Sequence, residues 1–450
     1  MKVKTLEESH LKGGLKCLII LQVEERLPSK FTIFGGFCKP GATLKFNFDD
    51  DFLWGVSTSA HQIEGNNTNS DWWKFEAEGK IKNGDRSGKA CNSSELYHQD
   101  IELAKALNVN AFRFSVEWAK VEPREGEFDQ EVLHRYADEV IYMQKNGIEP
   151  MVTLHHFTNP LWIAEFGGWE SKRTIAFFLR YVQMILDTIG SVKYFITINE
   201  PNVYALFGYL QGYWPPEIKN RKKMKKVLAN MALAHSKVYD LIHSKIPDAK
   251  VSTAINTAIF RSKTSSPLDL IMTRIVNYQY NFSFLDSVFY GKTHSPVGKI
   301  TLPGGIKLDF IGLNYYTRFL VGFGFTPKIS FGDLPKTEMG YEIYPQGIKN
   351  IIEIVWKRYK IPIIITENGV ADGEDKIRPE YIMKTLESLS IAVSEGVKLK
   401  GYFHWSLMDN FEWLDGFGPR FGLYHTDFRT FKRTLRKSGE LYSKICSNQL

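Results

Sequence analysis

Cysteine is scarce in this chain: four of its 450 residues are cysteines, namely Cys17, Cys38, Cys91 and Cys446. They form no C-x-x-C pair and are too few for a domain held together by disulfides. The spacing therefore excludes a disulfide framework and a cysteine-based metal module. It predicts reduced thiols, which are typical of a cytoplasmic protein.

Long apolar runs are missing as well. The N-terminal apolar run at 17–23 is much shorter than the roughly 20 residues that a membrane-spanning helix needs. No small-residue cleavage site follows it closely, so a secretion signal is not indicated. We therefore predict neither a membrane partner nor export from the cytoplasm.

A large excess of one charge is also missing. The net charge is +7, from 57 basic and 50 acidic side chains, and part of this excess lies in the run 220–226. No aromatic residues alternate with these lysines, so the run favours the solvated start of a helix over a nucleic-acid site. Hydrophobic residues make up 43% of the chain, which predicts a globular protein with a large core.

Two parts of the chain differ in pattern. Residues 1–44 show no clear amphipathic period, and we treat them as an N-terminal appendage to a domain at 45–450. In that domain, short runs rich in Val, Ile and Phe alternate with stretches of helical period. The eight expected strands are 52–56, 111–115, 150–154, 194–198, 251–255, 310–313, 362–365 and 401–405. Since eight strand–helix units close a sheet without edges, we predict an α/β fold with a single catalytic (β/α)8 TIM barrel.

Two of the intervening helices show the period directly. Apolar residues recur at one-turn spacing over 132–141, and Gly147 follows as a stop. The same spacing runs over 175–189 before Gly190. Each apolar stripe predicts a helix that packs on the outside of the barrel.

Polar and aromatic residues follow nearly every predicted strand. Because active sites of such barrels form at the carboxyl ends of the strands, these side chains should converge. In chain order they are Gln62, Arg113, His156, Asn199, Glu200, Asn314, Tyr316, Glu367, Trp405, Glu412 and Trp413. Trp405, Trp413, Phe421 and Tyr316 are the aromatic residues at the mouth that are plausible platforms for a sugar.

Glu200 and Glu367 are the best candidates for the two carboxyl groups that glycoside hydrolysis requires. Arg113 is the only arginine within a predicted strand, and a permanent cation beside Glu367 would keep that carboxylate ionised as the nucleophile. Glu200 has no evident cationic partner, which favours a raised pKa and a role as acid/base. Pro201 should bias the backbone of Glu200 toward an extended conformation.

Structural roles compete with these functional ones. Glu200, followed by a proline, could cap the next helix, and Arg113 could belong to a structural ion-pair network. A lone histidine such as His156 is more often a structural residue than a ligand.

Other barrel chemistries are also possible. A Schiff-base aldolase needs a lysine at a carboxyl end, but Lys193 and Lys400 fall at the opposite ends of their strands. A metal hydrolase needs converging ligands, whereas the adjacent His155 and His156 should point to opposite faces. We therefore predict no metal and no cofactor. A sugar-binding barrel without catalysis is a further alternative, which the presence of both glutamates disfavours.

Several motifs together resemble family 1 of the glycoside hydrolases, the group of β-glucosidases, β-galactosidases and β-mannosidases. The likeness covers about residues 45 to 445. It is carried by FLWGVSTSAHQIEG at 52–65, FRFSVEW at 112–118, TLHHFTNP at 153–160, TINEP at 197–201, GLNYYTR at 312–318, ITENG at 365–369 and WSLMDNFEW at 405–413.

The resemblance implies residue roles. It makes Glu200 the acid/base and Glu367 the nucleophile, with Arg113 and Tyr316 touching the nucleophile. It implies hydrogen bonds to the sugar hydroxyls from Gln62, His156, Asn199, Glu412 and Trp413, with Trp405 as the apolar floor. Asn314 and Phe421 complete the expected substrate site.

The resemblance also limits the range of substrates to be expected. Phe157 stands where many relatives have tryptophan, so one indole donor is missing. Glu412 should repel a 6-phosphate, and Glu200 argues against the thioglucosidase branch, which lacks it. The implied enzyme is a retaining β-glycosidase of small β-glycosides or short oligosaccharides, best described as a β-glucosidase with β-galactosidase and β-fucosidase side activity. A β-mannosidase or a 6-phospho-β-glycosidase is the alternative.

Overall fold

The computed structural model describes residues 46–449. The predicted appendage at 1–44 lies outside these residues. Within the described part of the chain, no helix combines the length and the apolar character needed to cross a bilayer.

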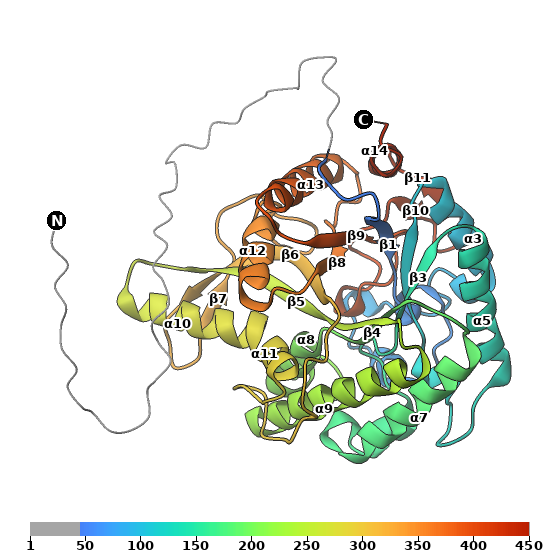
Figure 1. The fold of residues 1–450 in the computed structure, drawn as a ribbon, viewed down its shortest axis with the longest axis horizontal. Coiled ribbons are helices and arrows are strands. Elements are labelled where there is room, and N and C mark those ends of the chain that lie inside the picture. Colours follow the sequence, from blue (N-terminus) through green and yellow to red (C-terminus); the bar gives the residue numbers. More distant parts are fainter. Residues whose placement is uncertain (1–45, 450) are drawn as a thin grey trace. The chain divides into compact units, whose positions relative to one another are not determined.

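Eight parallel strands close into a barrel, which confirms the predicted single (β/α)8 fold (Figure 1). Neighbouring strands follow the order β5-β4-β3-β2-β1-β9-β8-β6, and pairing of β5 with β6 closes the ring. The strands are β1 Leu53–Ser57, β2 Ala111–Ser115, β3 Glu149–Thr153, β4 Tyr194–Asn199, β5 Lys250–Ser262, β6 Ile311–Gly322, β8 Ile363–Asn368 and β9 Leu399–Trp405. A short strand, β7 Lys328–Ser330, pairs antiparallel with β6, and β10 Tyr424–Thr426 pairs with β11 Arg433–Leu435.

Helices surround the barrel or follow its strands. The longer ones are α3 Ser93–Ala106, α5 Gln130–Lys145, α7 Arg173–Thr188, α9 Arg221–Lys245, α10 Pro267–Asn277, α11 Ser283–Tyr290, α12 Gly347–Tyr359, α13 Arg378–Ser394 and α14 Lys437–Cys446. The shorter ones are α1 Ala60–Ile63, α2 Asp71–Ala77, α4 Trp118–Val121, α6 Leu161–Glu165 and α8 Pro201–Ala205. Single turns lie at Lys82–Gly84, Gly168–Glu170, Leu206–Gln211, Tyr278–Phe282 and Trp413–Asp415.

The helices that the apolar period predicted are present. Helix α5 contains the stripe at 132–141 and is capped by Asp129, whose carboxylate accepts from the backbone N–H groups of Glu131 and Val132. Helix α7 contains nearly all of the stripe at 175–189. The basic run at 220–226 starts α9, where the side chain of Asn220 caps two backbone N–H groups. The prediction that this basic run starts a helix is therefore confirmed.

Apolar side chains fill the interior of the barrel at the amino ends of the strands. They come from successive strands and are Ala111, Met151, Ile196, Ala254, Phe310, Ile364 and Phe403. Gly55 makes room for this layer, because a Cβ atom there would overlap the ring of Phe403. The barrel is therefore closed below, and only its carboxyl end can hold a site.

Two strands run beyond their predicted ends. The predicted segments 251–255 and 310–313 are the barrel portions of β5 and β6, which stay paired as far as Ser262 and Val321. The extension is only partly buried, although it includes the apolar runs 258–260 and 319–321. It forms a two-stranded ribbon above the barrel rim, and β7 adds a third strand to it.

Candidate active site

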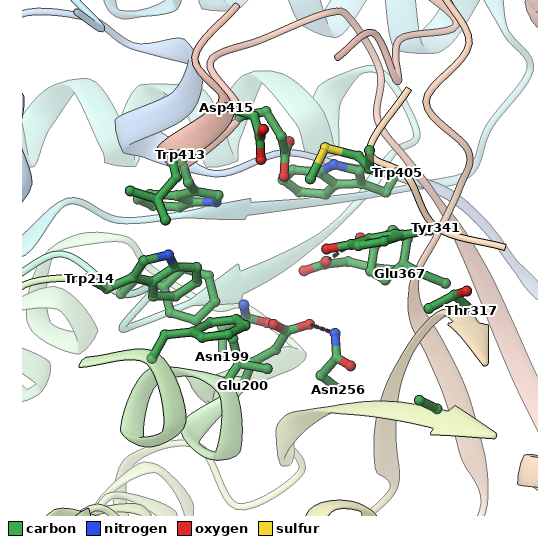
Figure 2. A pocket seen from close by; sticks show the side chains of 18 of the residues that line it. Asn199, Glu200, Trp214, Asn256, Thr317, Tyr341, Glu367, Trp405, Trp413 and Asp415 are labelled. Atoms are coloured by element: carbon green, nitrogen blue, oxygen red, sulfur yellow. Dashed lines mark hydrogen bonds between the residues drawn. The ribbon is translucent and has the colours of Figure 1, made fainter. Parts of the chain in front are cut away.

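A cavity of about 230 Å³ opens at the carboxyl ends of the strands. Figure 2 shows Trp405 and Trp413 along one side of it and Glu200 with Asn256 on the other. Of the predicted site residues, those that line the cavity are Gln62, His156, Asn199, Glu200, Tyr316, Glu367, Trp405, Glu412, Trp413 and Phe421. Arg113 and Asn314 lie behind this surface and are fully buried.

Glu200 follows β4 directly, and its backbone is in the left-handed region with φ 43°. The expected extended conformation is therefore wrong. The turn is held on both sides, since the N–H of Glu200 donates to the carbonyl of Ala254 (2.7 Å) and its own carbonyl accepts from Tyr204 in α8 (3.0 Å). The tertiary bond to Ala254 and the first helical bond of α8 together override the bias that Pro201 imposes. Glu200 occupies the N-cap position of α8, yet its side chain caps no helix N–H.

The side chain of Glu200 enters the cavity with one oxygen held. Its Oε1 accepts hydrogen bonds from the amides of Asn256 (2.8 Å) and Asn314 (2.8 Å). Among the described residues, none donates to Oε2. Burial of the carboxyl group, and then the nearby charge of Glu367, raise the pKa of Glu200 to about 8. Glu200 is therefore mostly protonated at neutral pH.

Glu367 lies in β8 in a different environment. Its Oε1 forms an ion pair with the guanidinium of Arg113, and its Oε2 accepts from the hydroxyl of Tyr316 (2.7 Å). Arg113 is fully buried and also donates to Asn199 (2.8 Å) and Thr153 (3.0 Å). A buried cation and a phenol donor thus hold both oxygens of this carboxyl group in fixed positions.

Irregular strand register turns these side chains toward the cavity. The register shifts between Ile196 and Asn199 in β4, between Leu313 and Asn314 in β6, and between Ile365 and Asn368 in β8. Such bulges redirect side chains at the rim of a barrel. They bring the carboxyl groups of Glu200 and Glu367 to face the same space (Figure 2).

A set of polar groups extends from the two glutamates across the cavity floor. The amide of Asn199 donates to Nε2 of His156 (3.2 Å), and Gln62 donates to Glu412 (3.3 Å). Burial, with the charge of Arg113 added, holds the pKa of His156 well below its usual range. Burial and the charges of Asp415 and Glu367 raise the pKa of Glu412 to about 8. The floor therefore offers mostly neutral donors and acceptors, as a sugar requires.

Aromatic rings form the walls. Trp405 and Phe421 pack together beside Tyr316. Trp413 packs against Trp72 at 4.6 Å between ring centroids and against Phe157 at 5.1 Å. These walls can cover the apolar faces of a pyranose ring.

Several lining residues were not among the sequence candidates: Asn256, Tyr280, Trp214, Met339, Tyr341 and Asp415. Asn256 directly follows the predicted strand 251–255, so the rule that found the other polar residues could have found it. Tyr280 belongs to a π-helical turn, and Trp214 and Tyr341 come from long loops. No local pattern indicates where such loops fold.

The groups that rival chemistries need lie elsewhere. Lys193 precedes β4, and Lys400 lies near the start of β9, where it pairs with Asp49 and Asp51. His156 lines the cavity, whereas His155 turns away and contacts Asn159 (3.1 Å). Within residues 46–449, no three side chains of His, Cys, Asp or Glu are grouped as metal ligands.

Comparison with known proteins agrees with this geometry. The sequence pattern of glycosyl hydrolase family 1 matches residues 44–450. The chain is 34% identical to β-glucosidase A of Thermotoga maritima over 89% of this chain and 98% of that protein.

Solved structures are similar over the same span. A β-glycosidase from Pyrococcus horikoshii superimposes with a TM-score of 0.86 at 39% identity, covering 90% of this chain and 96% of that one. The β-glucosidase of Thermotoga maritima in complex with glucoimidazole superimposes with a TM-score of 0.84 at 33% identity. The match covers 89% of this chain and 99% of that one. Fold and site thus define an O-glycosyl hydrolase built on a (β/α)8 barrel. The chain belongs to glycosyl hydrolase family 1, whose members are retaining enzymes.

Proposed function

We propose that this enzyme removes terminal β-linked sugars with Glu200 as acid/base and Glu367 as nucleophile. The observation that carries the proposal is the contrast between two carboxyl groups on one cavity. Glu367 is paired with Arg113, while burial raises the pKa of Glu200 to about 8. One group is poised to attack and the other to give a proton.

In the first step, an oxygen of Glu367 bonds to the anomeric carbon as the bond to the aglycone oxygen breaks. The proton of Glu200 moves to that oxygen, so the aglycone leaves as a neutral alcohol. The carboxylate becomes an ester, and Arg113 and Tyr316 keep the attacking group in place until the bond forms.

In the second step, water attacks the same carbon from the side that the aglycone left. Glu200, now ionised, accepts the proton of that water, and Glu367 departs as a carboxylate. Two inversions restore the original configuration. Both glutamates return to their starting charge states.

The two amides beside Glu200 determine where its proton resides. Asn256 and Asn314 both donate to Oε1, so Oε1 serves as the carbonyl oxygen of the protonated acid. The proton then sits on Oε2, which has no partner among the described residues. Tyr280 donates to Oδ1 of Asn256 (2.8 Å) and thereby orients its amide group toward Glu200. We assign Asn256 as a positioning residue for the acid.

Replacing Asn256 with alanine should shift the alkaline limb of the pH profile of kcat/KM upward. The hydrogen bond from Asn256 favours the ionised carboxylate and lowers the pKa of Glu200, so its loss raises that pKa. Activity requires the protonated acid and is lost as the pH rises through this value. We therefore expect the limb to move to higher pH, by a few tenths of a unit to about one unit.

Asn230→Ala is the matched control. Asn230 is buried, its amide donates to the carbonyl of Trp169 (2.8 Å), and neither residue lines the cavity. This variant should lose stability without moving the limb. An unchanged or downward-shifted limb in Asn256→Ala would remove Asn256 from the proposed role.

The polar floor and the aromatic walls support a neutral hexose as the sugar. Gln62, His156, Asn199 and Glu412 line the cavity and would bond its hydroxyl groups, while the ring of Trp405 would cover an apolar face. Phe157 contributes no indole donor, which should weaken discrimination between epimers. We propose a β-glucosidase with side activity on β-galactosides and β-fucosides.

A panel of nitrophenyl β-glycosides tests this substrate assignment. We expect the highest kcat/KM on the glucoside, lower values on the galactoside and fucoside, and still lower values on the mannoside. Hydrolysis of glucoside-6-phosphate should be negligible, because no lysine or arginine of the described residues lines the cavity to bind the phosphate, whereas Asp415 does line it. Activity should persist in a chelator. Preference for the mannoside or the phosphorylated sugar would support the alternative enzymes instead.

We also propose that the protein acts in the cytoplasm. Its described cysteines, Cys91 and Cys446, are both free thiols, which suits a reducing compartment.

A further inference from the structure

Helix α10 directs its apolar residues away from the barrel. Leu268, Ile271 and Ile275 recur at one-turn spacing, and 51%, 53% and 44% of their surfaces are exposed. The buried residues of the helix are Asp269 and Val276. A surface helix of a globular protein normally has the opposite arrangement.

The turn between β6 and β7 continues this apolar surface. Phe323 and Ile329 are each 50% exposed, and Phe325 is completely exposed. The backbone N–H of Phe323 donates to the carboxylate of Asp269 (2.6 Å), which ties the turn to α10. Helix α10 contacts β5 and β6, and β6 pairs with β7; Figure 1 shows these elements at one edge of the fold. We call this the α10–β7 surface: Leu268, Leu270, Ile271, Ile275, Phe323, Phe325 and Ile329.

Positive charge surrounds the α10–β7 surface. Lys263, Arg274 and Lys328 are exposed near it, and within the described residues none of them forms a salt bridge. Residues 261–330 hold eight basic and three acidic side chains, whereas the whole chain has a net charge of only +7. Two of the three acids, Asp269 and Asp286, are buried. Two of the eight cations are paired with acids elsewhere, and Asp333 lies exposed three residues after β7. Lys263, Arg274 and Lys328 therefore leave an excess of positive charge at this edge.

The positive charge around the α10–β7 surface distinguishes between its possible binding partners. A second copy of the chain, docked through the same face, would place two positive rims against each other, which is repulsive. An anionic lipid surface offers both an apolar interior for the exposed rings and opposite charge for the lysines. We propose that the α10–β7 surface docks onto an anionic bilayer, with Leu268, Ile271 and Phe325 inserted at the level of the headgroups.

This surface lies next to the mouth of the active site. Thr257 and Ala258 of β5, and Thr317 and Phe319 of β6, line the cavity. A few residues further on, the same two strands lead into α10 and the β6–β7 turn. Docking would thus hold the cavity mouth beside the lipid headgroups. The sequence predicted no membrane partner because it lacks an apolar run long enough to span a bilayer. A short helix whose apolar stripe faces outward indicates binding at the membrane surface, which that criterion does not detect.

Sedimentation of the full chain with vesicles tests the proposal. Vesicles of equimolar phosphatidylcholine and phosphatidylglycerol should carry the protein down, whereas pure phosphatidylcholine should carry much less. High salt should weaken binding, since screening reduces the attraction. The double variant Ile271→Ser/Phe325→Ser should lose at least about tenfold in partitioning.

The matched control is Ile354→Ser/Ile391→Ser, which removes two similarly exposed isoleucines (45% and 49%) on α12 and α13. It should bind vesicles as the wild type does. Both double variants should hydrolyse a soluble nitrophenyl glucoside normally, so that misfolding is detected. Absence of binding to the anionic vesicles, or an equal loss in both double variants, would overturn the proposal. So would a dimer, seen by light scattering, that only Ile271→Ser/Phe325→Ser disrupts.

Discussion

Glu367→Ala is expected to lower kcat/KM by on the order of 10⁵-fold, because no other group can form the glycosyl ester. The carboxylate that lies between Arg113 and Tyr316 would be gone, and Arg113 would be left as a buried cation without its partner. The variant should therefore also be less stable. Rates on a dinitrophenyl glucoside, with the thermal midpoint measured alongside, give both quantities.

Azide separates lost catalysis from lost folding in this variant. It should fit the space that Glu367 vacates and attack the anomeric carbon there, giving the α-glycosyl azide with inverted configuration. Only a folded site can produce this product. Glu139→Ala serves as the control, since Glu139 is a buried carboxylate in the helical layer, paired with Arg135. It should cost stability with little effect on kcat/KM. Near-normal hydrolysis by Glu367→Ala would exclude Glu367 as the nucleophile.

Glu200→Gln should lower kcat/KM far more for substrates with a poor leaving group than for those with a good one. An alkyl glucoside needs a proton on the departing oxygen, and we expect its kcat/KM to fall by about 10²- to 10⁴-fold. A dinitrophenolate departs without help, so kcat/KM for that substrate should change only slightly. The alkaline limb, which reflects the raised pKa of Glu200 near 8, should vanish from the pH profile.

The second step provides an independent readout for the same residue. Without a base to activate water, the glycosyl-enzyme should accumulate and give a burst of dinitrophenolate. In Glu200→Ala, azide should attack this intermediate and yield the β-glycosyl azide, opposite in configuration to the product from Glu367→Ala. Equal losses on both leaving groups, or an α-azide, would contradict the acid/base assignment.

The sequence was sufficient for most of the fold because the strand signal is local. Apolar runs such as 111–115 and 194–198 are β2 and the core of β4, and the one-turn stripes are α5 and α7. Placement of Glu200 and Glu367 in one cavity followed from the same pattern. In a closed parallel barrel every strand ends at the same rim, so residues directly after strands converge whatever their distance along the chain.

The sequence did not predict features that depend on contacts between different elements. The left-handed backbone of Glu200 is held by the bond from its N–H to Ala254 in the neighbouring strand, against the bias of Pro201. Asn314, expected to contact the sugar, instead lies buried behind Glu200, where Thr366, the extra residue of β8, donates to its side-chain oxygen (2.6 Å). The amide of Asn256 is aimed by Tyr280, which belongs to a different element.

By itself, the sequence determined the barrel, the position of the site at its rim and the two acidic residues that face it. Periodicity and strand ends are properties of neighbouring residues, and neighbours are what a sequence displays. Only the tertiary structure decided which oxygen of Glu200 is held, which loops wall the cavity and which way the apolar stripe of α10 faces. A stripe of leucine and isoleucine specifies a helix face, but the rest of the fold determines whether that face meets the core or the solvent.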